Sequence, residues 1–218
     1  MLQAGAGFVA GTIGWMDIKL ILLAVPALAL SIAFHEMMHA FASDALGDDT
    51  ARRAGRISLN PLKHIDPFMT IGLPLVLLLV GLPPFGAARP VPFNQHRVRF
   101  SEFGVALIAL AGPLANLLLA AIVGLIYRVF LPSDGLFLDA LVILLQVNIG
   151  FFVFNLIPFP PLDGSRVLYA FAPEPLQAIM RQIEALGMIG LVIFMFVLFP
   201  LLQPIFYNLS DFFINLIT

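Results

Sequence analysis

The chain has 218 residues, of which 61% are hydrophobic and 11% are charged, and its mean hydropathy is +1.01. Soluble domains carry roughly twice that charged fraction, so the composition excludes a soluble protein and indicates an integral membrane protein with the lipid bilayer as its main solvent. The net charge of −2 argues against a nucleic-acid partner, and the absence of cysteine excludes disulfides and thiolate metal sites.

The first predicted membrane helix covers residues 18–46 and follows an apolar, glycine-interrupted lead, residues 1–17, in which no cleavable signal peptide is evident. At a rise of 1.5 Å per residue this helix is about 43 Å long, which exceeds a hydrocarbon core of about 30 Å. Residues 35–39 read His-Glu-Met-Met-His. They begin about 25 Å into the helix, so we expect them a little inside the far face of the bilayer.

His35 and His39 are four residues apart, and on a helix they lie on one face, one turn from each other. This spacing suits two imidazoles that bind one tetrahedral zinc ion. Glu36 lies about 100° around the helix from His35, where a carboxylate can take a proton from activated water. Polar residues near a helix end can also simply reach the interface. A chance match is disfavoured because the whole chain has only four histidines and four glutamates.

The next part of the chain predicts a surface loop and a hairpin. Residues 47–67 are polar, and residues 68–82 are apolar but only about 22 Å long as a helix, so they form either a short span or a re-entrant segment. Residues 83–99 are rich in proline and glycine. Residues 88–93 within them are expected to be extended, because each proline biases its predecessor away from the helix.

The rest of the chain predicts further helices. Residues 102–130 form the second strong membrane helix, with a bend at Gly112-Pro113, and residues 136–157 form the third. Three prolines then break the chain before Leu-Asp-Gly at 162–164. We expect an amphipathic interfacial helix at 165–185, a fourth apolar helix at 186–202, and a helix at 205–217 with one polar face that lies at the interface or packs on the bundle.

A catalytic zinc needs a third protein ligand beside the two histidines. The candidates are few: His64, Asp66, His96, Glu102 and Asp163. Asp163 is attractive because it follows a membrane helix and a proline-broken stretch, and irregular backbone at membrane depth is tolerated only against protein or a water-filled cavity. An ordinary Asp-Gly turn explains the same residues equally well.

Three stretches resemble the motif set of one family: residues 35–39, the Gly-Pro-Leu-Ala-Asn of 112–116, and Asn-Leu-Ile-Pro-Phe-Pro-Pro-Leu-Asp-Gly at 155–164. In this order they resemble the site-2 protease family of intramembrane zinc metalloproteases. Residues 47–67 and 88–94 resemble its compact prokaryotic branch, which lacks PDZ and CBS domains. The resemblance covers most of residues 18–164.

The resemblance implies one zinc ion per chain, bound by His35, His39 and Asp163, with Glu36 as general base. It also implies that Asn155 acts near the reacting carbonyl as a second catalytic residue. Within the second motif, Pro113 and Asn116 are possible structural or substrate-contacting residues. Amide side chains also hydrogen-bond between packed membrane helices, and Asn148 and Asn155 share a helix face as packing residues would. Gly112-Pro113 is better explained as a bend that permits close helix packing than as part of the chemistry.

The predicted ligands constrain the topology. His39 and Asp163 both lie near helix ends, so their two helices must run in the same direction to meet at one metal. An odd number of full crossings must then separate them, which predicts that residues 68–100 return to their own side. Residues 47–99 carry seven basic residues. The positive-inside rule therefore places this region, and the active site near it, at the cytoplasmic face of a cell membrane.

We therefore expect an all-α integral membrane protein, a polytopic bundle of about four to six membrane helices with a re-entrant or extended hairpin near 68–100. It is expected to be a single protease domain, 1–218, with its catalytic core at 18–164 and C-terminal helices at 165–218. The expected function is hydrolysis of peptide bonds in or near transmembrane segments of membrane proteins, in regulated proteolysis. A metal or ion transporter and a membrane-anchored zincin that cuts at the surface are the alternatives.

Overall fold

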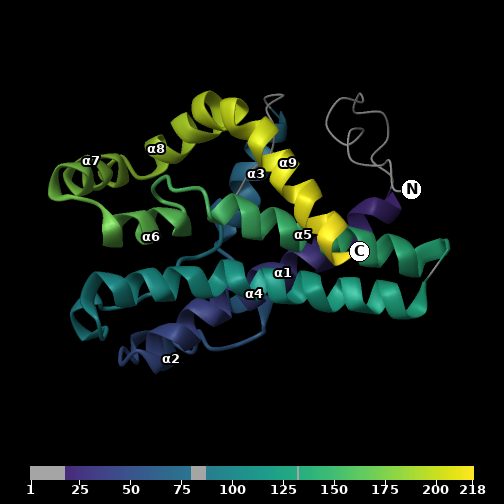
Figure 1. The fold of residues 1–218 in the computed structure, drawn as a ribbon, viewed down its shortest axis with the longest axis horizontal. Coiled ribbons are helices and arrows are strands. Elements are labelled where there is room, and N and C mark those ends of the chain that lie inside the picture. Colours follow the sequence, from purple (N-terminus) through teal and green to yellow (C-terminus); the bar gives the residue numbers. More distant parts are fainter. Residues whose placement is uncertain (1–17, 80–86, 132) are drawn as a thin grey trace.

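The computed structural model describes residues 18–79, 87–131 and 133–218, and this part of the chain is helical without any strand (Figure 1). The long helices follow the predicted apolar stretches. In chain order the elements are α1 (Ile18–Ala45), α2 (Thr50–Arg53), η1 (Pro61–Lys63), η2 (Pro67–Gly72), α3 (Leu73–Leu79), η3 (Gln95–Arg97), α4 (Ser101–Phe130), α5 (Gly135–Asn155), α6 (Asp163–Phe171), α7 (Glu174–Ala185), α8 (Met188–Ile193), η4 (Phe194–Leu198) and α9 (Phe199–Ile217).

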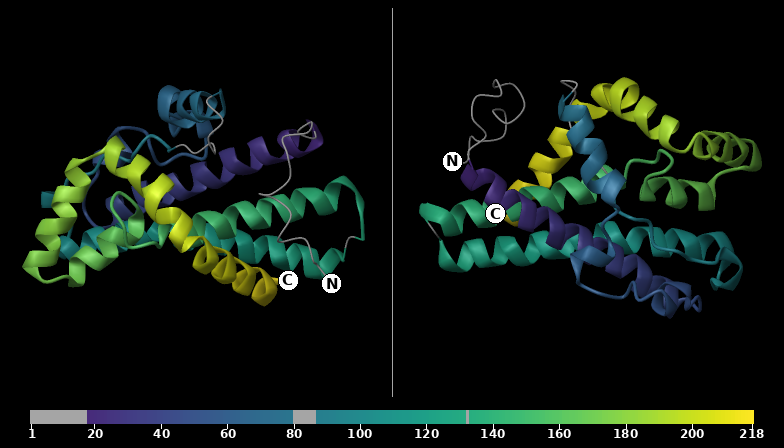
Figure 2. Two further views of the ribbon diagram at one scale, coloured as in Figure 1. Left: turned by 90° about the horizontal axis from the view of Figure 1, so that it is seen from above. Right: turned by 180° about the vertical axis from the view of Figure 1, so that it is seen from behind.

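Within the described residues, four helical stretches are long and apolar enough to cross a membrane: Lys19–Ala45, Ser101–Phe130, Gly135–Asn155 and Met188–Ile217. The predicted all-α polytopic bundle is therefore confirmed. Helices α1, α4 and α5 run side by side, and α9 crosses them obliquely (Figures 1 and 2). Helix α4 is the most buried of the four, since α1, α5 and α6 all pack against it.

One face of α1 explains how this helix packs. Every fourth residue along it is buried: Ala27, Ser31, His35, His39 and Ser43. Small side chains dominate the facing surface of α4 as well, and small residues allow membrane helices to approach closely where lipid removes any hydrophobic driving force. Large apolar residues of α4, such as Leu118 and Leu125, are exposed on the opposite face. The two histidines of the motif therefore belong to the packed face of α1.

Helices α1 and α5 run in the same direction, as the predicted ligand set requires. Lys19, at the start of α1, forms an ion pair with Asp139, near the start of α5. Helix α4 lies between them in the chain and runs the opposite way (Figure 1). One crossing thus separates the end of α1 from the start of α5, and the far ends of both helices lie on one side.

The hairpin near 68–100 returns to its own side. The amide of Ala87 donates to the carbonyl of Met69 at 3.1 Å, and the Thr70 hydroxyl donates to the carbonyl of Ala87 at 2.7 Å. Helix α3 projects away from the core helices α1, α4 and α5 (Figure 2). The apex at 80–86 and the predicted lead at 1–17 lie outside the described residues.

Two buried charges hold the loop after α1 against the chain that follows the hairpin. The Asp48 carboxylate accepts hydrogen bonds from Thr50 and from the amide of Asn94. The Arg56 guanidinium donates to the carbonyls of Arg89 and Pro90. Residues 87–94 contain neither helix nor strand. Their backbone groups bond to Asp48 and Arg56 as well as to the main chain, where the amide of Arg89 donates to the carbonyl of His64 at 2.8 Å.

The C-terminal part of the chain corrects two predictions. The single amphipathic helix expected at 165–185 is two helices, α6 and α7, because Pro173 cannot continue the first. The two helices expected at 186–202 and 205–217 are one continuous span from Met188 to Ile217. Pro204 lies inside α9, where it removes only one helix hydrogen bond, and membrane helices tolerate that loss. Helix α9 packs on the bundle through its apolar residues Phe206, Phe213, Ile214 and Ile217. On its polar face Asn208, Asp211 and Asn215 stay exposed, and the last two line a cavity of about 190 Å³.

The Asp48 contacts predict a pH-dependent contribution to stability. Burial alone would raise the pKa of the Asp48 carboxyl, but hydrogen bonds from Thr50, Asn94 and Ser43 lower it below its ordinary value of 3.8. Because the pKa of Asp48 is lower in the folded than in the unfolded state, its ionised carboxylate stabilises the fold at pH values above the unfolded-state pKa. This contribution is lost as the pH falls through the folded-state pKa.

We therefore expect Asp48→Asn to lower the stability by about 1–3 kcal/mol at pH 7, since it weakens charge-assisted hydrogen bonds to a buried group. Thermal unfolding in detergent should show a lower Tm at pH 7 and a difference from wild type that shrinks below about pH 4. Asp134→Asn is the control, because Asp134 is exposed and its side chain caps no helix. An equal Tm for Asp48→Asn and wild type at pH 7 would contradict the anchoring role.

Candidate metal centre

Three side chains from distant parts of the sequence converge where α1, α4 and α6 meet. The Nε2 atoms of His35 and His39 are 3.0 Å apart. The Asp163 Oδ2 atom lies 3.1 Å from the His35 Nε2 and 3.3 Å from the His39 Nε2. Among the described residues this is the group of histidine and carboxylate ligands that could hold a metal ion.

The spacing of these three atoms fits one tetrahedral ion. Zinc bonds to imidazole nitrogen and carboxylate oxygen of roughly 2.0–2.2 Å place neighbouring ligand atoms about 3.3 Å apart. The measured separations of 3.0, 3.1 and 3.3 Å are close to that edge length. Three protein ligands leave one corner open, which is the arrangement of catalytic zinc sites.

Both imidazoles are held by hydrogen bonds at their other ring nitrogen. His39 Nδ1 lies 2.7 Å from the main-chain carbonyl of Ile108, and His35 Nδ1 lies 2.6 Å from the Oδ1 atom of Asn116. Both rings are buried, with 5% and 8% of the residue exposed for His35 and His39. Such outer contacts orient metal-binding histidines, and here both come from α4.

Asp163 is the first residue of α6, and a close approach between helices fixes it. A Cβ atom on the next residue, Gly164, would lie 2.2 Å from the carbonyl oxygen of Leu156. Only glycine therefore lets the start of α6 press against the end of α5. Burial alone would raise the pKa of the Asp163 carboxyl, but His39 and His35 lower it below its ordinary range. Its place in the first turn of α6 also favours negative charge.

Gly112 of α4 forms one wall of the centre. A Cβ atom added there would lie 2.4 Å from His39 Nε2 and 2.7 Å from His35 Cε1. The backbone of α4 therefore lies directly against both rings, with no room for a methyl group. Pro113 beside it is fully buried inside a helix that continues to Phe130. The α4 backbone thus packs closely against the centre at Gly112, and a role of Pro113 toward substrate stays a prediction.

Glu36 lies next to the centre without belonging to the three converging ligands. It is partly exposed, and its charge interacts with His39 and with the Arg56 guanidinium. Within the described part of the chain its carboxylate makes no hydrogen bond, so it is free to take a proton. This is the position that the sequence predicts for a general base, and that role stays a prediction.

Asn155 is partly buried at the end of α5, and its side-chain amide donates to the carbonyl of Phe151 at 3.0 Å. The Phe151 ring lies 6.1 Å from the His35 ring, so Asn155 is one helical turn beyond the centre. Its catalytic role stays a prediction, because its amide bonds to its own helix.

Sequence reasoning did not single out Asn116 as a partner of His35, or Gly112 as the wall of the centre.

The other candidate ligands lie away from the centre. Asp66 caps η2 by accepting from the amides of Phe68 and Met69. His64 is buried in the loop and contacts the carbonyl of Ser58 at 2.7 Å. The remaining two lie outside the three converging ligands: His96, which is exposed, and Glu102, which accepts from Gln95.

The contact at Gly112 predicts that a single methyl group disrupts metal binding. We expect Gly112→Ala to lower zinc affinity at least tenfold, since the added Cβ displaces both ligand rings. Chelator competition on purified protein measures the affinity, and thermal unfolding checks the fold. Gly150→Ala is the matched control, because nothing lies within 4 Å of its added Cβ. Unchanged zinc affinity in Gly112→Ala would show that the rings do not bind metal as placed here.

Comparisons with known proteins agree with this centre. The chain is 38% identical to YwhC of Bacillus subtilis over 194 residues. The aligned region covers 82% of this chain and 85% of that protein. It is 28% identical over 195 residues to Rip2 of Mycolicibacterium smegmatis, covering 89% of this chain and 73% of that protein. A relative in Methanocaldococcus jannaschii is 28% identical over 152 residues, with 70% of this chain and 72% of that protein covered.

Each of these relatives is provisionally named a zinc metalloprotease. No family model and no solved structure matches the chain. The identity with the Bacillus protein extends over most of both chains, and the motifs fit the same assignment. The chain therefore belongs to the compact, site-2 protease-like family of zinc metalloproteases.

Proposed function

We propose that the chain is an intramembrane zinc endopeptidase that cuts membrane-protein substrates within or near their transmembrane segments, in regulated proteolysis. The observation that carries the proposal is the convergence of His35, His39 and Asp163 between membrane helices, at separations of 3.0–3.3 Å. A carboxylate, Glu36, stands beside them. Two imidazoles, one carboxylate and an adjacent free carboxylate are the groups that metal-assisted hydrolysis uses.

The three ligands would hold one zinc ion per chain. When bound, zinc polarises the substrate carbonyl and lowers the pKa of water toward 7. Glu36 accepts the proton that water gives up and returns it to the nitrogen of the leaving amine. Asn155 is proposed to donate to the oxygen of the reacting carbonyl, for which its amide turns away from Phe151.

The surroundings of the centre support an apolar substrate. A cleft of about 340 Å³ lies beside the start of α6 and next to Gly164, and it is lined by Leu110, Leu156, Pro158, Gly164, Val167, Leu168 and Phe171. A substrate helix must unwind locally, because its carbonyls are occupied by internal hydrogen bonds. Residues 87–94 offer an extended backbone to such an unwound segment, which is a known form of peptide recognition.

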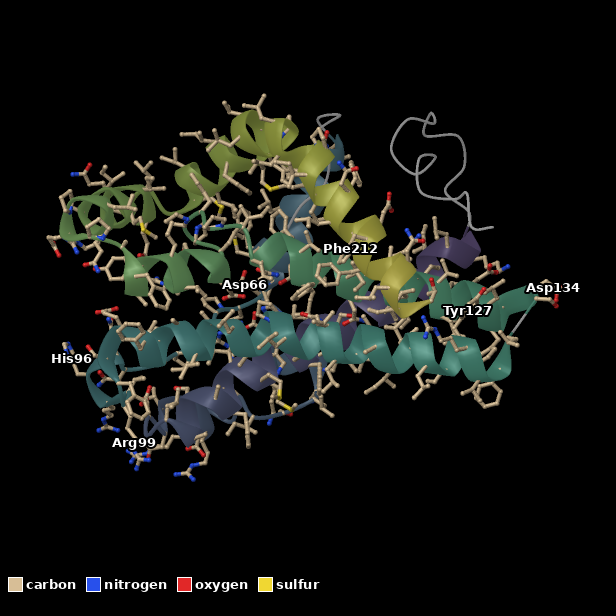
Figure 3. The ribbon with its side chains drawn as sticks, in the orientation of Figure 1. Asp66, His96, Arg99, Tyr127, Asp134 and Phe212 are labelled. Atoms are coloured by element: carbon tan, nitrogen blue, oxygen red, sulfur yellow. The ribbon has the colours of Figure 1, made fainter. Side chains whose placement is uncertain are left out.

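Charge supports an orientation with the centre near the cytoplasmic face of a multi-pass prokaryotic cell membrane. The seven basic residues of 47–99 lie at the end of the bundle where α1 ends. His96 and Arg99 project there, whereas Asp134 lies at the opposite end (Figure 3). Cytoplasmic loops carry an excess of lysine and arginine.

Replacing the proposed base separates a protease from its alternatives. We expect Glu36→Gln to keep the three metal ligands and zinc content but to lose proteolysis by at least about 10²-fold, the usual contribution of a general base. Co-expression with candidate single-span membrane proteins, followed by detection of cleaved fragments, measures this. A transporter that uses the same ligands should retain its transport, and cleavage by Glu36→Gln at the wild-type rate would contradict the mechanism.

The orientation has its own test, which the absence of cysteine makes simple. We expect a membrane-impermeant thiol reagent to label Ser133→Cys from outside intact cells, and to label Leu59→Cys only after permeabilisation. Both positions are accessible to a reagent, since Leu59 is 53% exposed and Ser133 is exposed in the loop before α5. The reverse labelling pattern would place the centre near the outer face instead.

A further inference from the structure

Two fully buried asparagines lie behind His35. Asn116 of α4 and Asn148 of α5 are both 0% exposed. The Nδ2 atom of Asn116 lies 3.2 Å from the carbonyl oxygen of Ser31 and 2.8 Å from Oδ1 of Asn148. Its Oδ1 atom lies 2.6 Å from Nδ1 of His35. This asparagine pair, Asn116 and Asn148, therefore joins α1, α4 and α5 at the back of the metal centre.

The direction of each hydrogen bond in this pair is fixed by two main-chain carbonyls, which can only accept. The Asn148 Nδ2 atom donates to the carbonyl of Leu144 at 2.8 Å, so its Oδ1 must face Asn116. The Asn116 Nδ2 atom donates to the carbonyl of Ser31 and to that Oδ1, so its own Oδ1 must face His35. An amide oxygen has no hydrogen to give, and His35 Nδ1 must therefore carry the proton.

The consequence concerns the other ring nitrogen of His35. A neutral imidazole has one protonated and one unprotonated nitrogen, so a proton held on Nδ1 leaves the Nε2 lone pair free. The carbonyl of Ile108 imposes the same tautomer on His39. Both Nε2 atoms thus face each other and Asp163 as acceptors, at 3.0–3.3 Å, and one bound metal cation satisfies all three at once.

We infer that Asn116 is a positioning residue that sets the tautomer and ring orientation of His35 for metal binding, and that Asn148 fixes the orientation of Asn116. The inference rests on the proposed zinc site. Hydrogen-bond partners of ligand histidines typically change metal affinity 10- to 100-fold when they are removed. Asn116 contacts His35 directly, whereas Asn148 contacts only Asn116. Removing Asn116 should therefore weaken metal binding more than removing Asn148.

A packing role is the competing explanation, since amides join membrane helices for a modest gain. The two explanations depend on different atoms of Asn116. Packing across the bundle depends on its Nδ2 donors, which bind Ser31 and Asn148. Positioning of His35 depends only on its Oδ1 acceptor. An aspartate keeps an acceptor oxygen and loses both donors, so Asn116→Asp separates them.

The experiment measures zinc affinity by chelator competition on the purified full-length chain, with Tm measured in parallel. We expect Asn116→Leu to weaken zinc binding about 10- to 100-fold and Asn148→Leu to weaken it less. Asn116→Asp should keep affinity within about threefold of wild type even though its Tm falls, because the acceptor remains. Asn208→Leu is the control, since this amide of α9 is exposed and distant in sequence from the ligands.

The visible absorption of cobalt-substituted protein gives a second readout, because it reports the coordination of the metal. Wild type and Asn116→Asp should give the same tetrahedral spectrum, and Asn116→Leu a changed one. Wild-type affinity in Asn116→Leu, or equal losses in Asn116→Asp and Asn116→Leu, would overturn the positioning role. Should Asn116→Leu not fold, wild-type affinity in Asn148→Leu would overturn it. Failure of the wild-type chain to bind zinc would instead contradict the proposed function.

Discussion

The close packing of α1 against α4 is the constraint on which the rest of the structure depends. Lipid offers no hydrogen bonds, so each polar group placed at membrane depth must find a partner inside the protein. The buried face of α1 carries Ser31, His35 and His39 in successive turns, and α4 supplies the atoms that receive the two rings. Gly112 makes this possible, because its missing side chain brings the α4 backbone into contact with both imidazoles.

The loop between α1 and α4 follows the same logic with different chemistry. It carries two buried ionised side chains, Asp48 and Arg56, and each satisfies main-chain groups of residues that have no regular secondary structure. Residues 87–94, which form neither helix nor strand, are tied by Asp48 to the loop that follows α1.

Much of this arrangement could be predicted from local sequence. The spacing of His35 and His39 places them on one helix face, and the run of apolar residues gives the long helices within a few positions. The direction of α5 followed from the need to bring Asp163 to the same metal. Contacts between helices could not be predicted in this way, because a uniformly apolar helix such as α4 does not reveal which face meets α1. Asn116 and Gly112 therefore gained their meaning only from the packing. The C-terminal span was wrongly divided between residues 202 and 205, although Pro204 lies inside a continuous helix.

The ligands of the centre are far apart in the chain, and this has a consequence for biosynthesis. His35 and Asp163 are separated by 128 residues, so the two imidazoles and Glu36 enter the bilayer long before the third ligand has been translated. A ribosome-bound chain that has inserted only α1 and α4 holds an incomplete set of metal ligands. The three-ligand set is thus complete only once α5 has inserted and α6 has docked, so any chemistry at this centre has to wait for the later part of translation.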